Sequence, residues 1–158
     1  MRVAIGQDSH RFDLENKDNK KLILAGVIFE EEVPVLANSD GDVILHAVTN
    51  AISGITTKNI LGNRTKQLLK DGVTDSKVYL KEALNYLDGK IIHLSISIEC
   101  KKPKISPKIS EMRKSLSNLL GIPENSIGIT ATSGEELTEF GKGNGINVFA
   151  CITVSECN

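Results

Sequence analysis

The chain has 158 residues and a formal net charge of −1, from 19 basic and 20 acidic side chains, with no Trp, two Tyr and four Phe. This length predicts one domain over residues 1–158 with a core of its own. The balanced charge and the few aromatic side chains argue against a nucleic-acid partner, and no apolar run reaches the roughly 20 residues of a membrane span.

The first quarter of the chain is predicted to form short strands. Residues 2–5 are apolar-rich, and the polar segment that follows places Asp8 and His10 at the end of this strand. Residues 22–29 are apolar on both sides of Gly26, which predicts two short strands with a bend between them.

A helix is predicted to begin after Asp42, which is a suitable N-cap. Apolar residues recur on one side of this helix, namely Val43, Ala47, Val48, Ala51 and Ile52. Gly54 is a natural stop, and His46 lies on the first turn, beside the cap.

The middle of the chain is predicted to contain a loop, a helix and a strand. Residues 56–75 are polar and interrupted by glycine, so we expect a partly mobile loop. A helix follows from Asp75 to Gly89. Between residues 92 and 99, apolar and polar side chains alternate, which predicts a half-exposed strand whose apolar face carries Ile92, Leu94, Ile96 and Ile98.

The last third of the chain is predicted to add one helix and two strands. A turn with two prolines precedes a helix at residues 109–120, which Gly121 ends. Residues 127–132 and 146–154 predict strands, separated by a glycine-rich, charged segment. Strands at both ends with helices between them indicate an α+β fold with one mixed β-sheet and helices packed on one face.

The chain contains three cysteines, Cys100, Cys151 and Cys157, without CxxC spacing. This odd number disfavours both a disulfide framework and a zinc ribbon. We expect small buried thiols in a reducing compartment, and therefore a cytoplasmic protein.

Three side chains are candidate ligands of one metal ion. Asp8 and His10 are two residues apart, so on a regular strand both point to the same face. His46 would supply a third ligand and leave a fourth position open, as in catalytic zinc sites. In the alternative interpretation, Asp8 is a surface carboxylate that pairs with His10. Asp42 is then an ordinary helix cap, and His46 beside it binds no metal. His93 lies on the polar side of its strand, and we expect it to face solvent.

Residues 131–135 (ATSGE) leave a strand and enter a glycine turn. Hydroxyls and free backbone N–H groups at such a junction suit phosphate oxygens, and Glu135 could hold a second cation that bridges them. A helix cap is an equal alternative, because Ser133 followed by Glu136 matches the capping box.

Two further segments could attract anions. The basic run formed by Lys101, Lys102, Lys104 and Lys108 could be an anion-binding rim, although such a run is more often a solvated face. Residues 141–145 (GKGNG) resemble a phosphate-binding loop without the Walker spacing, and we interpret them as a turn.

The order of these motifs resembles the 2-C-methyl-D-erythritol 2,4-cyclodiphosphate synthase family. The matching segments are residues 6–12 (GQDSHRF), 39–43 (SDGDV) with 46–47 (HA), 103–104 (PK) with Pro107 and 112–113 (MR), and 131–135 (ATSGE). The resemblance runs from about Arg2 to Val154. It implies an enzyme of the non-mevalonate isoprenoid pathway that forms a homotrimer with active sites between neighbouring subunits.

The resemblance also implies a reaction. The 2-phosphate of 4-diphosphocytidyl-2-C-methyl-D-erythritol 2-phosphate attacks the β-phosphate, which closes the ring of 2-C-methyl-D-erythritol 2,4-cyclodiphosphate and releases CMP. Because both reacting groups belong to one molecule, catalysis depends mainly on positioning and on neutralising phosphate charge with metal ions.

The matching positions imply a role for individual residues. Asp8, His10 and His46 match zinc ligands, and Glu135 matches the carboxylate that holds Mg²⁺ or Mn²⁺ on the substrate diphosphate. Asn38 and Ser133 stand at catalytic positions. The implied substrate-binding residues are Asp8, Ser9, His10, Asn38, Ser39, Asp40, Ile60, Leu61, Gly62, Cys100, Lys101, Lys102, Pro103, Lys104, Ile105, Ser106, Ala131, Thr132, Ser133, Gly134, Glu135, Phe140 and Lys142.

Several positions depart from the family pattern. They are Asn38 in place of His, Asn50 in place of Asp, residues 58–63 (KNILGN) in place of the usual loop with an Asp that contacts the ribose, Lys142 in place of Arg, and Asn144 in place of Glu. Asn38 can still donate a hydrogen bond to a phosphate oxygen, but it cannot carry a proton. The metal triad and Glu135 are retained, which favours an active, divergent enzyme.

The alternative function is a catalytically silent trimer of the same fold that contains zinc. Such a protein would bind a nucleotide, or an isoprenoid diphosphate on the three-fold axis with Lys142. The altered Asn38 and the altered loop favour this alternative, whereas the retained metal ligands favour the enzyme.

Overall fold

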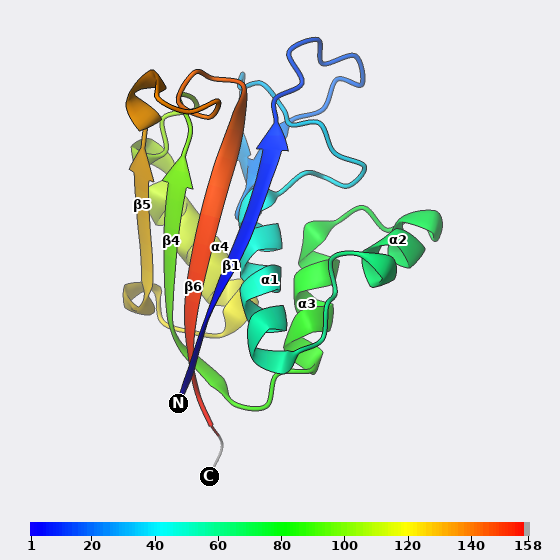
Figure 1. The fold of residues 1–158 in the computed structure, drawn as a ribbon, viewed down its shortest axis with the longest axis vertical. Helices are drawn as coiled ribbons and strands as arrows, with labels where there is room; N and C mark the ends of the chain where they lie inside the picture. The colour runs from blue at the N-terminus through cyan, green and yellow to red at the C-terminus, as the bar shows by residue number, and fades with distance from the viewer. Residues whose placement is uncertain (157–158) are drawn as a thin grey trace.

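The computed structural model describes residues 1–156, and its centre is a four-stranded sheet in the order β1-β6-β4-β5 (Figure 1). The strands are β1 (Arg2–Arg11), β4 (Lys90–Glu99), β5 (Ile127–Thr132) and β6 (Gly145–Ser155). β6 runs antiparallel to β1 and β4, while β4 and β5 are parallel, so the sheet is mixed. β1, β4 and β5 therefore all end on the same side of the molecule.

The helices lie on one face of this sheet (Figure 1). α1 (Val43–Thr56) packs on β1 and β6, α4 (Ile109–Leu120) packs on β5, and α3 (Ser76–Asn85) packs on α1. A hairpin of β2 (Leu22–Leu24) and β3 (Val27–Phe29) precedes them. The predicted α+β architecture is confirmed. In the described residues 1–156, no helix is long and apolar enough to cross a membrane.

The core lies between the sheet and the helices. Side chains that alternate along β4 and β6 are fully or almost fully buried there, namely Leu94, Ile96, Ile98, Ile146, Val148, Ala150, Ile152 and Val154. Each buried Leu or Ile side chain stabilises the fold by roughly 1.5–3 kcal/mol. On the opposite face of the sheet, the described residues 1–156 provide no such cover, and Val3, Ile5 and Phe149 are exposed there by 62%, 68% and 44%.

Asp42 fixes the start of α1. Its buried carboxylate accepts hydrogen bonds from the N–H groups of Leu45 (3.1 Å), Ala25 (2.9 Å) and Gly26 (2.6 Å). It therefore caps the helix as predicted and also ties the β2–β3 turn to it. Burial raises the pKa of Asp42 to about 6, against the lowering effect of these three hydrogen bonds.

The segment between α1 and α3 differs from the prediction of a partly mobile loop. It contains α2 (Asn63–Lys70), and Ile60 and Leu68 are buried in the core. This helix was not predicted because its sequence is mostly polar. A helix that is largely solvated needs only a few apolar side chains to face the core. α1 also continues past Gly54 to Thr56, and Thr57 caps it in the left-handed conformation.

β1 runs to Arg11 and carries Asp8 and His10 near its end, as predicted. Two other features differ from the prediction. α3 ends at Asn85, not at Gly89. In β4, an irregularity between Ile91 and His93 shifts the register, so Ile91 is buried and Ile92 is 42% exposed. A bulge of this kind inverts the faces on one side of it, which strict alternation does not anticipate.

The cysteines only partly follow the prediction of buried thiols. Cys100 is buried, which raises the pKa of its thiol to about 11, while Cys151 is half-buried on the open face of the sheet. Both carry free thiols. Cys157 lies outside the described residues.

Candidate functional site

β1 and the first turn of α1 bring together the three predicted metal ligands. Asp8 and His10 point to the same face of β1, toward α1, and His46 faces them from the helix. Asp8 Oδ2 lies 3.0 Å from His10 Nε2 and 3.0 Å from His46 Nδ1, and the two nitrogens are 3.3 Å apart. Among the described residues, this is the group of His, Cys, Asp and Glu side chains placed to hold a metal ion.

The three side chains also perturb one another electrostatically. Burial alone would raise the pKa of Asp8, but hydrogen bonds and charges from His10 and His46 outweigh it and lower the pKa to about 2. Burial alone would lower the pKa of His10, but its hydrogen bond to Asp8 and the charge of Asp8 raise that pKa above its usual value. Asp8 is therefore a carboxylate over the physiological range, as a metal ligand must be.

This donor set fits a divalent metal. Bonds of 2.0–2.1 Å in a tetrahedral site place ligand atoms roughly 3.4 Å apart, close to the separations in the triad. Two imidazole nitrogens and one carboxylate oxygen suit zinc and related ions, and three protein ligands leave one position for an exogenous oxygen.

Neighbouring groups hold the outer nitrogens of both histidines. His10 Nδ1 lies 3.2 Å from the carbonyl oxygen of Leu36. His46 Nε2 lies 2.8 Å from Ser76 Oγ, and the Ser76 hydroxyl is hydrogen-bonded to the carboxylate of Asp40. Ser76 was not among the predicted site residues, because the Asp75–Ser76 pair looks like an ordinary helix start and no local pattern indicates that α3 contacts His46.

A second group of predicted residues lies where β4 and β5 end. Here the backbone N–H of Cys100 donates to the carbonyl oxygen of Thr132 (3.1 Å), and Lys101 pairs with Glu136 (2.6 Å). The segments 100–106 and 131–135, which both carry predicted substrate-binding residues, are therefore side by side. Lys101, Lys102 and Lys104 are exposed.

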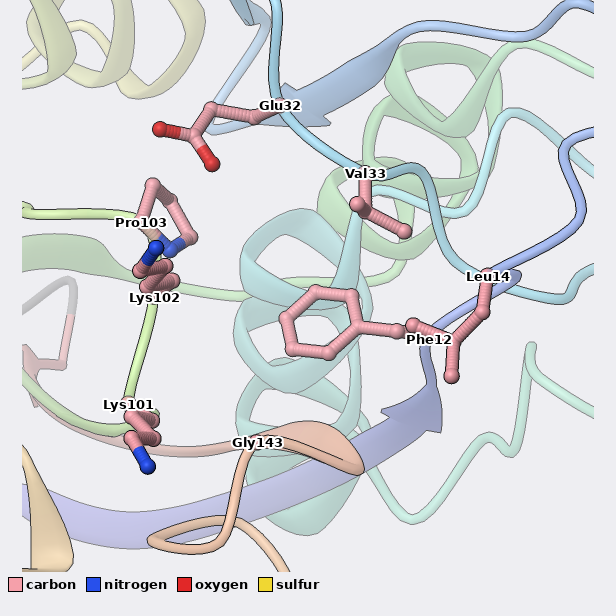
Figure 2. A pocket seen from close by; sticks show the side chains of 8 residues that line it. All are labelled: Phe12, Leu14, Glu32, Val33, Lys101, Lys102, Pro103 and Gly143. Carbon is pink, nitrogen blue, oxygen red and sulfur yellow. The ribbon is translucent and has the colours of Figure 1, made fainter.

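A hollow of about 170 Å³ adjoins residues 101–103 (Figure 2). Figure 2 shows the ring of Phe12 pointing into it, with Lys101, Lys102 and Pro103 on one side and Glu32 above. The walls are mostly apolar, and charged groups stand at the rim. Such a space suits a flat, partly polar group.

The segment 133–136 combines a cap with an unusual backbone. Ser133 Oγ accepts a hydrogen bond from the N–H of Glu135 at 3.5 Å, whereas Glu136 pairs with Lys101 and does not complete a capping box. Glu135 and Glu136 both have positive φ, 50° and 60°. This conformation costs non-glycine residues roughly 1–2 kcal/mol each and leaves the Glu135 side chain exposed.

The remaining predicted residues lie in different environments, some exposed and some buried. Asn38 is exposed beside the loop that leads to α1. Ser39 is buried, and its hydroxyl accepts from the N–H of Gly41 at 3.2 Å. Ser9 lies between the candidate metal ligands Asp8 and His10 in β1, so its side chain points to the opposite face of the sheet. His93 is also on that face and exposed, as predicted.

Three of the residues that depart from the family pattern form polar contacts within the chain. Asn50 donates to the carbonyl oxygen of Gln7 at 2.9 Å and so ties α1 to β1. Lys142 (3.1 Å) and Asn144 (2.6 Å) both contact Glu139, and the hydrogen bonds from Asn144 and Lys142 lower the pKa of Glu139. Ile60 is buried, Leu61 is half-buried and Gly62 is exposed ahead of α2.

The two groups of predicted residues are separated within one chain. The metal triad lies on β1, while segments 100–106 and 131–135 follow β4 and β5, and β6 lies between them. Two strand spacings place β1 roughly 10 Å from β4.

Comparisons with known proteins all identify the same family. The sequence model of the YgbB family matches residues 1–155. A curated 2-C-methyl-D-erythritol 2,4-cyclodiphosphate synthase from Chlamydia caviae is 52% identical, over 99% of this chain and 91% of its own length. The protein of the same name from Chlamydia trachomatis serovar L2b is 51% identical, over 98% of this chain and 88% of its own length.

Solved structures are similar over the same range. A structure of 2-C-methyl-D-erythritol 2,4-cyclodiphosphate synthase with CDP bound has a TM-score of 0.83 and 27% identity, covering 98% of this chain and all of the other. The crystal structure of the synthase from Plasmodium vivax has a TM-score of 0.78 and 27% identity, covering 98% and 99% of the two chains.

Proposed function

The chain belongs to the YgbB family, and we propose that it catalyses the cyclisation for which its relatives are named. The substrate is 4-diphosphocytidyl-2-C-methyl-D-erythritol 2-phosphate, and the products are 2-C-methyl-D-erythritol 2,4-cyclodiphosphate and CMP. The protein is thus a lyase of non-mevalonate isoprenoid precursor biosynthesis. The observation that carries the proposal is the assembled triad of Asp8, His10 and His46 in a chain 52% identical to a curated synthase over almost its whole length.

Asp8, His10 and His46 would hold the first metal, for which zinc is our proposal. The bound ion would supply positive charge that neutralises and orients phosphate oxygens. The side chains contribute two neutral nitrogens and one carboxylate, which leaves a net positive charge on the loaded site. Glu135 would hold Mg²⁺ or Mn²⁺ on the substrate diphosphate, a role that its exposed position beside segment 100–106 supports.

The chain's own polar groups would position the reacting phosphates. An oxygen of the 2-phosphate forms a bond to the β-phosphorus, and the bond from that phosphorus to the CMP oxygen breaks. The attacking oxygen is already ionised and CMP leaves as a phosphate, so no side chain has to remove or supply a proton. The Asn38 amide, Ser39 and the hydroxyls of Thr132 and Ser133 would donate hydrogen bonds to phosphate oxygens.

The two ends of the substrate would occupy different segments. The cytosine would lie against residues 100–106, where a hollow adjoins Lys101 and Pro103. Residues 60–62, ahead of α2, would also contact the substrate. Phe140 and Lys142, which flank Gly141, would also contact the substrate.

We propose a homotrimer with shared active sites. Val3, Ile5 and Phe149 are apolar and exposed on the open face of the sheet, and association would bury them. The triad and segments 100–106 and 131–135 lie on strands separated by β6 within one chain, which is compatible with a site completed by a neighbouring subunit. An isoprenoid diphosphate on the axis would meet Lys142, and the free thiols of Cys100 and Cys151 suit the cytoplasm.

Phosphorus NMR of the purified protein with zinc, magnesium and the cytidine substrate tests this function. We expect the signals of the linear diphosphate to give way to those of a cyclic diphosphate and CMP in equal amounts. Unchanged substrate, with zinc bound at one equivalent per chain, would contradict catalysis and favour the silent trimer.

A further inference from the structure

The outer nitrogen of His46 meets a short relay of buried polar groups. His46 Nε2 lies 2.8 Å from Ser76 Oγ, and the Ser76 hydroxyl is hydrogen-bonded to the carboxylate of Asp40. Asp40 is itself held in place, since it accepts hydrogen bonds from the backbone N–H groups of Ser76 (3.0 Å) and Asp42 (3.1 Å).

The donors and acceptors in this relay can be arranged in only one way. A carboxylate accepts but does not donate, so the single hydroxyl hydrogen of Ser76 must go to Asp40. Ser76 Oγ can then only accept from His46, which requires a hydrogen on Nε2. In the neutral imidazole that binds a metal ion, Nδ1 then keeps its lone pair, and it is this nitrogen that faces Asp8 at 3.0 Å.

His10 offers an internal comparison. Its Nδ1 lies 3.2 Å from the carbonyl oxygen of Leu36, an acceptor that requires a hydrogen on Nδ1. In the neutral ring, the lone pair is then on Nε2, which lies 3.0 Å from Asp8 Oδ2. The backbone thus sets the tautomer of one histidine, and two side chains set that of the other.

The helix itself makes no use of the Ser76 hydroxyl. Asp75 caps α3 by accepting from the N–H of Lys77 at 2.9 Å, so Ser76 is not needed as a cap. Ser76 is fully buried, which excludes water as a substitute for its hydroxyl. Helix formation therefore does not explain why a serine stands there.

We infer that Ser76, backed by Asp40, is a positioning residue that fixes the tautomer and the ring orientation of His46, so that Nδ1 is directed to the metal ion. This inference rests on the metal-dependent function proposed above. It places Asp40 behind the metal site and not in contact with substrate. Partners of this kind typically contribute 10- to 100-fold to metal affinity.

Zinc affinity tests the relay through matched variants. We expect Ser76→Ala to weaken zinc binding roughly 10- to 100-fold in competition with a chromophoric chelator. Ser117→Ala is the control, because Ser117 also donates a short hydrogen bond, 2.6 Å to the carbonyl oxygen of Ile122, but lies at the far end of α4. It should leave zinc affinity unchanged. Equal affinity in Ser76→Ala and the unaltered protein would overturn the inference.

A nitrogen-15 NMR measurement on the unaltered, zinc-loaded protein needs no variant to fold. We expect a slowly exchanging hydrogen on Nε2 of His46 and on Nδ1 of His10, with zinc on the other nitrogen of each ring. Zinc bonded to Nε2 of His46 would overturn the relay while leaving the proposed function intact. A protein that binds no zinc at all would instead contradict the metal site of the proposed function.

Discussion

A Cβ atom at Gly6 would lie 2.1 Å from the carbonyl oxygen of Ala47. It would also lie 2.2 Å from the backbone nitrogen of Ala51, so α1 rests directly on β1 at this point. Backbone atoms within a helix cannot move aside as a flexible side chain can. Because His46 directly precedes Ala47, this close approach sets the distance between His46 and the ligands on β1.

Gly6→Ala should therefore destabilise the fold and weaken the metal site together. We expect a loss of about 3 kcal/mol or more in the free energy of unfolding, because a methyl group is forced against a rigid backbone. Gly128→Ala is the matched control, since the nearest atom to its Cβ would be 4.0 Å away, and it should be neutral or slightly stabilising. Denaturant unfolding measures both, and equal stabilities would contradict the packing argument.

His46→Ala should remove zinc and activity while the protein remains folded. Two remaining ligands do not hold zinc at the affinity of three, and the site lies at the rim of the core and not within it. His93→Ala, on the opposite face of the sheet, should keep one zinc per chain. Metal content after dialysis and circular dichroism measure the two outcomes, and the site is misassigned if His93→Ala loses zinc.

Zinc affinity should fall as the pH drops, starting above pH 6.5. Protons compete with the metal for His10, and its pKa is raised, chiefly by Asp8 acting against burial. A raised pKa means that the proton is held up to a higher pH, so competition begins earlier than for an ordinary histidine. Asp8, with a pKa of about 2, stays ionised throughout. Chelator competition from pH 5.5 to 8 checks this, and a constant affinity down to pH 6.5 would contradict it.

Asn38→Ala should lower kcat/KM by roughly 10- to 150-fold. This corresponds to about 1.5–3 kcal/mol, the usual scale for a hydrogen bond to a charged group. Asn38→His should change the rate little, because its ring can also donate and the reaction needs no proton transfer. Undiminished turnover in Asn38→Ala would move the phosphate contact to another residue, first to Ser39.

The open face of the sheet should hold the trimer together. Light scattering of the unaltered protein should give three times the chain mass of 17.1 kDa. Ile5→Asp places a charge where an apolar side chain is 68% exposed in the single chain, and should give monomers and lost activity. Tyr86→Asp, at an exposed position after α3, should remain trimeric. A stable monomer of the unaltered protein at micromolar concentration would contradict shared active sites.

Local patterns in the sequence were sufficient for much of the fold. The α4 helix has the predicted limits, because Gly121 supplies the left-handed C-cap that a helix end requires. The strand at residues 127–132 and the Asp42 cap were also predicted correctly. Each of these signals lies within a few residues of the element it defines.

Local sequence patterns gave the wrong prediction where contacts with a distant segment determine which side chains are buried. Ile92 fits the apolar alternation of its strand, but the irregularity between Ile91 and His93 turns it outward. The polar residues before α3 conceal α2, whose few apolar side chains are buried by packing on other elements. Burial depends on the partner surface, which a local window of sequence does not contain.

The candidate site shows the same division. The sequence was sufficient to predict the candidate metal ligands, because the two-residue spacing of Asp8 and His10 on a strand fixes their common face. Only the tertiary structure decided which ring nitrogen of His46 faces the other two candidate ligands, since Ser76 reaches His46 across 30 residues of chain through the packing of α3 on α1. The residue type at a position determines what chemistry its side chain can perform. The orientation of that side chain depends on partners that come into contact only on folding.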